Sequence, residues 1–232
     1  MPKPPRVLIL DNAIHRHLYR PAWAWKAHLK GIETKTVNIP SGAPIPPLDG
    51  FTHLLVTGSE ASILEPRPWF EREAVLLRTA VDRGTPILGS CFGHQMLVHA
   101  LSGPEYLRPA DPPEIGWAEI EMVASDPLFD GLANPWRAFV FHLGQAVDPP
   151  PPWRKLGRTR HCDTHVLRYG DRPVWGIQAH PEISSRKAKV FLRISLLLGL
   201  KPARHVLRAL RDAPPRNDVA ETVLQCFLQI PG

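Results

Sequence analysis

Short apolar runs and amphipathic segments alternate along the first hundred residues of the chain. Apolar or alternating runs bounded by turn residues predict buried strands at residues 6–10, 33–39, 53–57 and 86–89. Apolar side chains at helical spacing predict helices at residues 23–29, 68–83 and 96–101. This alternation is typical of a parallel sheet with helices on both faces. Right-handed crossovers then place the loops that follow the strands along one edge of the sheet.

The second half of the chain has a different pattern. Short strand-like runs separated by proline and glycine turns lie at residues 117–123, 138–142, 154–159 and 165–169, as in antiparallel additions to a sheet. A further buried strand is predicted at residues 174–178, and helices at 184–197, 203–211 and 219–228, the last with Asp218 as its N-cap. We therefore expect one α/β domain over residues 1–232. Its doubly wound, mostly parallel central sheet would have helices on both faces and a small antiparallel addition.

The charge of the chain changes this picture little. Its 232 residues carry a net charge of +6 and a sequence pI near 9.5, but basic side chains are interleaved with acidic ones. The compact basic cluster of Arg204, Arg208 and Arg211 has helical spacing, which fits a solvated helix face. We therefore expect no nucleic-acid partner.

Segments that the sequence lacks indicate the compartment. No run of about 18 apolar residues is present, and residues 1–6 have no apolar core of the kind that signal peptides carry. The three cysteines, Cys91, Cys162 and Cys226, are too few, and odd in number, for a disulfide framework. We expect a soluble cytoplasmic protein without a membrane partner.

The most specific chemical signal is the sequence Gly-Ser-Cys-Phe-Gly-His-Gln at residues 89–95. It links a buried strand to an apolar helix, and the form G-x-C-x-G is the cysteine version of the nucleophile elbow. So tight a turn packs closely on its neighbours, which requires glycine on both sides of Cys91. At a helix N-terminus the unpaired N–H groups favour the thiolate. The pattern indicates a nucleophilic cysteine rather than a structural one.

A candidate base follows the last buried strand, in residues 178–182, Gln-Ala-His-Pro-Glu. Pro181 favours an extended conformation at His180, and in extended chain residues two apart point to the same side. His180 and Glu182 are therefore expected to be neighbours. In this interpretation His180 takes the proton of Cys91, and Glu182 orients the imidazole. Alternatively, His180 only ends a strand and Glu182 opens a helix, but the presence of the elbow favours the catalytic interpretation.

These two blocks resemble the signatures of class I glutamine amidotransferases, the triad glutaminases. Between them, Glu-Ile-Gly-Trp at residues 114–117 and the stretch 170–176 look like the branch related to the amidotransferase domain of GMP synthase. The resemblance runs from the first strand to the last helix. It implies a class I glutamine amidotransferase-like, flavodoxin-like fold in a single glutamine amidotransferase type 1 domain.

The resemblance also implies roles for individual residues. Cys91 would attack the side-chain amide of glutamine to form a γ-glutamyl thioester, with release of ammonia, and water would then release glutamate. Backbone N–H groups of Phe92 and of Gly58 or Ser59 would hold the oxyanion. Gln95 matches the family glutamine near the substrate, with an ordinary exposed helix position as the alternative. No cofactor is implied.

Two segments depart from the family pattern. The oxyanion loop, usually Gly-Gly-Pro or Gly-Ser-Pro, reads Gly58-Ser59-Glu60, so the stiffening proline is missing. Residues 141–145, Phe-His-Leu-Gly-Gln, stand where relatives often have a histidine followed by Gly-Asp. We assign His142 either a structural role or a place in the wall of the substrate pocket.

Metal-ligating side chains occur together at residues 161–165, His-Cys-Asp-Thr-His. Their spacings match no common zinc signature, and the run lies within a strand-turn-strand pattern. We therefore expect no metal site.

Three functions fit these observations. The first is a stand-alone glutamine amidotransferase that passes ammonia to a partner synthase subunit, since the chain has no phosphate loop and no acceptor domain. The second is a hydrolase that uses the same triad on γ-glutamyl peptides or amides. The third, a non-catalytic interaction module, is disfavoured by the intact set of Cys91, His180 and Glu182.

Overall fold

The structure, a computed structural model, describes residues 4–199, 203–214 and 219–232. Its strands are β1 (Arg6–Asp11), β2 (Glu33–Asn38), β3 (His53–Val56), β4 (Ile87–Ser90), β5 (Leu107–Met122), β6 (Trp136–Ala146), β7 (Trp153–Arg158), β8 (Val166–Tyr169) and β9 (Val174–Ile177). Its α-helices are α1 (Pro21–Lys26), α2 (Pro68–Asp82), α3 (Phe92–Ser102), α4 (Ser185–Leu197), α5 (Ala203–Arg211) and α6 (Val219–Leu228). Short 3-10 helices lie at Leu48–Gly50, Pro104–Tyr106 and Pro127–Phe129.

Every predicted strand and helix is present, most with ends shifted by a few residues. The first helix begins at Pro21, earlier than predicted, because proline fits the first turn of a helix. Ser184 is the N-cap of α4, where its side chain accepts a hydrogen bond from the backbone N–H of Lys187. The predicted cap of α6, Asp218, lies outside the described residues. Within those residues, no helix combines the length and the apolar character needed to cross a membrane.

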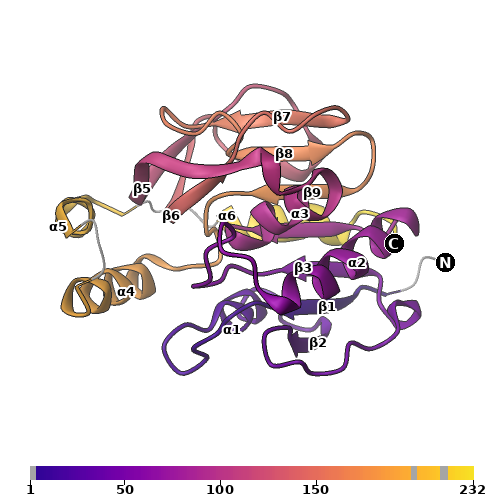
Figure 1. Cartoon of the computed structure of the whole chain (residues 1–232). Coiled ribbons are helices and arrows are strands. Elements are labelled where there is room, and N and C mark those ends of the chain that lie inside the picture. Colours follow the sequence, from indigo (N-terminus) through magenta and orange to yellow (C-terminus); the bar gives the residue numbers. More distant parts are fainter. Residues whose placement is uncertain (1–3, 200–202, 215–218) are drawn as a thin grey trace.

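A single sheet connects the strands in the order β2-β1-β3-β4-β9-β8-β7-β5-β6 (Figure 1). Strands β2, β1, β3, β4 and β9 pair in parallel. From β9 onward, through β8, β7, β5 and β6, each pairing is antiparallel. The sheet is therefore mixed: the predicted parallel arrangement holds for one half, and the antiparallel part is larger than the small addition we expected.

The antiparallel part is larger because β5 begins at Leu107, well before the predicted run. Its early part contains Pro109, Pro112 and Pro113. The pairing with β6 shifts register between Pro109 and Glu114, and an irregular segment of this kind is where a strand tolerates proline. Proline normally interrupts a strand, so the local pattern does not predict this part of β5.

Helices cover both faces of the parallel half, as predicted. Strand β1 is buried on both sides, so Leu8 and Leu10 pack under α2 and α3, while Val7 and Ile9 pack under α1 and α6. A strand covered on both faces needs a continuous apolar sequence rather than an alternating one. The first apolar run of the chain meets this requirement.

Helices α4 and α5 lie apart from these layers, beside β5 and β6 at the left of Figure 1. Leu192 of α4 and Ala209 of α5 form a separate buried cluster with Phe139 of β6. The backbone N–H of His180 donates to the carbonyl oxygen of Phe139. This cluster therefore supports the segment that carries the predicted base.

Candidate active site

The predicted reactive residues converge at the carboxyl edge of three adjacent parallel strands. Gly58 follows β3, Cys91 follows β4 and His180 follows β9. The register aligns Val56 with Gly89 and Gly89 with Gly176. The loops after these strands therefore leave the sheet side by side, as the predicted topology requires.

Cys91 occupies a strained turn at the start of α3. It is the N-cap of the helix, with φ 50° and ψ −107°, a backbone conformation that residues with a side chain rarely adopt. A Cβ at Gly89 would lie 2.6 Å from the carbonyl oxygen of Gly93, and a Cβ at Gly93 would overlap the carbonyl oxygen of Val56. The predicted need for glycine on both sides of the cysteine is confirmed.

His180 and Glu182 are neighbours, as the Pro181 argument predicts. His180 Nδ1 lies 2.9 Å from Glu182 Oε1, and both side chains are buried. Burial alone would lower the pKa of His180, but the charge of Cys91, then that of Glu182, and hydrogen bonds with both raise it to about 10. The three side chains therefore form one electrostatic unit around a charged imidazole.

Tyr19 belongs to the same site, although no sequence pattern predicts it. Its hydroxyl lies 3.5 Å from His180 Nδ1, and its ring meets the imidazole edge to face. Burial, followed by the charges of Glu182 and Cys91, raises the pKa of Tyr19 well above its usual range, which keeps the hydroxyl protonated. Tyr19 precedes α1 in an irregular segment, where neither period nor motif marks a single tyrosine.

The loop at Gly58, Ser59 and Glu60 faces the imidazole. A Cβ at Gly58 would lie 2.7 Å from His180 Cε1 and 2.5 Å from the Tyr19 hydroxyl, so glycine alone fits there. Glu60 occupies the place of the missing proline. Its carboxylate accepts hydrogen bonds from the backbone N–H groups of Ile14 and His15, at 3.0 and 3.1 Å. Two hydrogen bonds between Glu60 and the segment after β1 thus hold the loop, where the family pattern has the rigid ring of a proline.

Gln95 is buried one turn into α3, so the alternative of an exposed helix position is wrong. Its Nε2 donates to the carbonyl oxygen of Gly144 at 2.7 Å and to Gln178 Oε1 at 3.0 Å. These contacts fix the amide between the elbow helix, the end of β6 and the segment after β9. Its role as a substrate contact stays a prediction.

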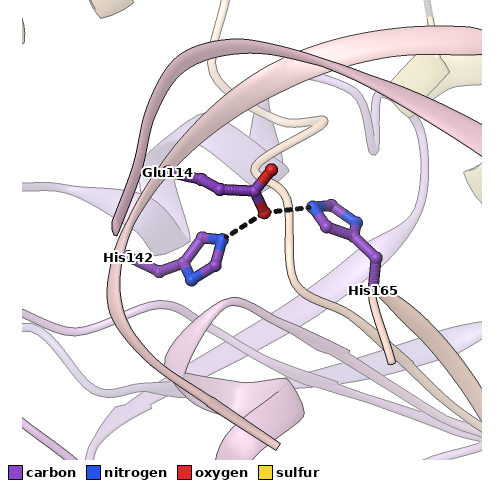
Figure 2. Close-up of side chains that lie close together, drawn as sticks. All are labelled: Glu114, His142 and His165. Atoms are coloured by element: carbon purple, nitrogen blue, oxygen red, sulfur yellow. Dashed lines mark hydrogen bonds and ion pairs between the residues drawn. The ribbon is translucent and has the colours of Figure 1, made fainter. Parts of the chain in front are cut away.

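His142 points away from solvent into a second polar cluster (Figure 2). Its Nδ1 donates to the carbonyl oxygen of Gly144, and its Nε2 lies 3.0 Å from Glu114 Oε2. His165 Nε2 lies 3.9 Å from the same carboxylate oxygen. Both ring nitrogens of His142 are engaged here, which favours the predicted structural role over a contact with substrate.

The other cysteines differ from Cys91 in their surroundings. Burial raises the pKa of Cys162 to about 12, and its side chain packs 3.8 Å from Thr164 Oγ1. Burial also raises the pKa of Cys226, whose thiol donates to the carbonyl oxygen of Asp130. Both are held as thiols, and the site contains only Cys91 among the three.

Comparison with known proteins agrees with this geometry. The family model "Glutamine amidotransferase class-I" matches residues 28–196. One subunit of the glutamine-hydrolysing GMP synthase of Pyrococcus abyssi is 26% identical over 181 residues, which cover 77% of this chain and 89% of the relative. The subunit of the same name from Methanococcus aeolicus is 25% identical over 201 residues, covering 83% and 99%.

Solved structures share the fold over almost the full length. A glutamine amidotransferase from Thermotoga maritima has a TM-score of 0.77 at 18% identity and covers 98% of this chain and 100% of its own. A glutamine amido transferase from Methylobacillus flagellatus has a TM-score of 0.73 at 20% identity, covering 99% and 95%. With the family match extending over most of the sheet and both signature blocks, the chain belongs to the class I glutamine amidotransferases.

Proposed function

We propose that this protein hydrolyses the side-chain amide of glutamine to glutamate and ammonia, through a γ-glutamyl thioester on Cys91. The observation that carries the proposal is the meeting of two features at one sheet edge. A strained elbow presents Cys91 after β4, and the hydrogen-bonded pair of His180 and Glu182 follows the adjacent strand β9. A nucleophile, a base and a group that orients the base are the parts that covalent catalysis needs.

Each step follows from this arrangement. His180 takes the proton of Cys91, and Sγ attacks the amide carbon of glutamine. The tetrahedral intermediate collapses when His180 returns the proton to the nitrogen, so that ammonia leaves and the thioester remains. Water then attacks the thioester with His180 as base, which releases glutamate and restores the thiol. Glu182 stabilises the charged imidazole in the states between these transfers.

The oxyanion would be held by backbone N–H groups of Phe92 and of Gly58 or Ser59. Donors of this kind contribute about 3 kcal/mol each to the transition state. The tether from Glu60 to the backbone of Ile14 and His15 supports the loop without the family proline. We therefore assign Glu60 as the positioning residue of this loop.

The ammonia would pass to a separate synthase subunit. The curated relatives named above are subunits of a glutamine-hydrolysing synthase, and the chain covers 89% and 99% of their lengths. This coverage supports a single amidotransferase domain over residues 1–232, which works together with another chain.

The decisive assay measures glutamate release from glutamine by the purified protein. We expect Cys91→Ala to abolish release, and His180→Ala to lower it by a factor of about 10²–10⁴, the range for loss of a general base. Glu182→Ala should impair release less, because it only orients the base. Cys226→Ala is the matched control and should keep wild-type activity, because its thiol lies outside the site.

Covalent labelling of Cys91 and a test of γ-glutamyl dipeptides distinguish glutamine hydrolysis from the hydrolase and interaction-module alternatives. A glutamine-like electrophile should label Cys91 in the wild type and fail to label His180→Ala. Strong cleavage of γ-glutamyl dipeptides with negligible glutamine turnover would instead select the hydrolase alternative. No release from either substrate, together with no labelling of Cys91, would leave only the interaction module.

A further inference from the structure

A second polar cluster lies on the antiparallel half of the sheet, formed by Glu114, His142 and His165 (Figure 2). Glu114 comes from β5 and His142 from β6, and His165 directly precedes β8. One ligand atom of each residue lies within 4.8 Å of the other two. Both histidines are buried, and the Glu114 carboxylate is largely so. The fold therefore gathers two imidazoles and a carboxylate that are remote in the sequence.

Neighbouring groups orient two of these ligands. Thr159 Oγ1 donates to Glu114 Oε1 at 2.8 Å, which leaves Oε2 for the histidines. His142 Nδ1 donates to the carbonyl oxygen of Gly144 at 3.1 Å. Metal-binding side chains in proteins usually have such outer partners, which fix the tautomer of a histidine and the direction of a carboxylate.

The contact between His142 and Glu114 requires a positive species. Because a carbonyl oxygen only accepts, His142 Nδ1 carries a hydrogen. A neutral ring then presents the lone pair of Nε2 to Glu114 Oε2, an acceptor 3.0 Å away. Either a second proton or a metal ion has to lie between these two acceptors.

The surroundings of His165 distinguish a second proton from a metal ion. Neither of its ring nitrogens has a hydrogen-bond partner in the described part of the chain, although the ring is fully buried. Its Nε2 lies 3.9 Å from Glu114 Oε2, too far for a hydrogen bond. A proton on His142 leaves His165 unsatisfied, and burial of an unsatisfied polar group costs about 1–3 kcal/mol. One cation coordinated by all three side chains gives His165 Nε2 a partner as well as His142 Nε2 and Glu114 Oε2.

The geometry points to a divalent transition-metal site with Glu114 Oε2, His142 Nε2 and His165 Nε2 as its protein ligands. Two imidazoles and one carboxylate suit Zn²⁺ and its neighbours better than Mg²⁺ or Ca²⁺, which prefer oxygen ligands. Bonds of about 2.0–2.1 Å around a tetrahedral ion place ligand atoms about 3.3 Å apart. The pair at 3.0 Å is close to this spacing. The pair at 3.9 Å and the two imidazole nitrogens, which lie within 4.8 Å of each other, would have to draw closer when the ion binds.

The site stabilises the wall of the active site and takes no part in the chemistry of Cys91. The carbonyl oxygen of Gly144 accepts from both His142 Nδ1 and Gln95 Nε2, so one backbone group joins the cluster to the elbow helix. The ion would cross-link β5, β6 and the start of β8 behind that group. This inference is independent of the proposed glutaminase activity.

Metal binding is tested with Zn²⁺ and Co²⁺ on the full-length protein after removal of metal by a chelator. Cys91→Ala is the background for every measurement, because cysteine sulfur is itself a ligand for Zn²⁺ and Co²⁺ and would confuse both the stoichiometry and the spectrum. We expect one equivalent of Zn²⁺ by equilibrium dialysis, a rise in thermal stability on addition of Zn²⁺, and a Co²⁺ spectrum of a tetrahedral site without thiolate bands.

Substitutions within the cluster then locate the ion. His165→Asn and Glu114→Gln should each abolish the stoichiometric binding, and their circular dichroism reports whether they fold. His161→Asn is the matched control, because it makes the same change at an exposed histidine in the same segment and should leave binding intact. Absence of a bound equivalent in the Cys91→Ala protein would overturn the proposal without any further variant. Retention of that equivalent in folded His165→Asn or Glu114→Gln would overturn it as well.

Discussion

At the residue scale, the tight turn at Cys91 depends on glycines, because their neighbours leave no space for a Cβ. Gly58, Gly89 and Gly93 all lie where a Cβ would come closer than real Cβ atoms do to their neighbours. At Gly93 the obstacle is the backbone of Val56, which has no rotamer to change, whereas at Gly58 it is the side chains of His180 and Tyr19. Glycine therefore prevents a clash with the backbone at one position and leaves space for the His180 and Tyr19 side chains at another.

Gly93→Ala should destabilise the protein by about 3 kcal/mol or more, because overpacking against backbone cannot be relieved by a side chain. The change is measured as the shift in the free energy of unfolding by urea. Gly144→Ala is the control, since the nearest atom to its Cβ would be 3.6 Å away, an ordinary contact. A similar loss of stability in both variants would contradict this account of the elbow.

Glu60→Ala should lower kcat/KM for glutamine about tenfold, which corresponds to about 1.4 kcal/mol, while the midpoint of thermal unfolding changes little. Its carboxylate is exposed, so its two hydrogen bonds to the segment after β1 contribute more to the position of the loop than to stability. Glu65→Ala removes a carboxylate from the same exposed stretch and should leave both quantities unchanged. If Glu60→Ala retains full activity, the tether does not preorganise the oxyanion loop.

At the scale of elements, a buried carboxyl group connects α2 to the segment after β1. Glu73 is fully buried on α2, and its Oε1 accepts a hydrogen bond from Asn12 Nδ2 at 2.9 Å. The backbone N–H of Asn12 donates to Thr57 Oγ1, so the contact also includes the end of β3. Burial raises the pKa of Glu73 to about 8, because the hydrogen bond from Asn12 does not compensate for the loss of hydration.

This carboxyl should make the protein less stable as the pH rises. Between the unfolded pKa of 4.5 and the folded pKa of about 8, the folded state holds a proton that the unfolded state has lost. The free energy of unfolding therefore falls with increasing pH in this window, by at most about 1.4 kcal/mol per pH unit from this group. Glu73→Gln, which stays neutral, should flatten the curve in urea titrations between pH 5 and 8. A slope that is the same in wild type and variant would assign the titration to other groups.

At the scale of the whole molecule, the two halves of the sheet differ in how completely other elements cover their strands. Strands β3 and β4 are buried along their whole length between helices on both faces. Strand β6 is at one end of the strand order, and Leu143 near its end is 51% exposed. The turn that carries Cys91 therefore follows a strand of the well-covered half, whereas the wall of the candidate site comes from the half with an open edge.

Hydrogen exchange should follow this difference. The amides of β3 and β4 should exchange slowest, close to the rate set by global unfolding, and those at the end of β6 should exchange through local opening. Mass spectrometry of peptic peptides measures both in one experiment. Addition of Zn²⁺ should slow exchange in β6 and leave β3 unchanged. Equal protection of the two regions without metal would contradict the difference in cover.

The sequence by itself determined the elements and singled out Cys91, His180 and Glu182 as the predicted catalytic set. Continuous apolar runs and an apolar period of three to four residues are local, so they predict β1, β3, β4 and α2 without knowledge of their neighbours. The elbow and the His-Pro-Glu segment are local as well, because a turn and a proline impose their geometry within a few residues. The early part of β5 escaped prediction because its prolines are tolerated only where its partner strand shifts register.

Only the tertiary structure decided which distant residues meet. Tyr19 reaches His180 across more than half of the chain, Glu60 reaches the backbone after β1, and His165 joins Glu114 and His142 through the order of the antiparallel strands. Local spacing in residues 161–165 excludes a zinc motif, yet one histidine of that run completes a cluster whose other members lie on β5 and β6. The physical reason is that sequence spacing encodes the conformation of a segment, whereas such contacts depend on how the strands are ordered in the sheet, which no segment encodes alone.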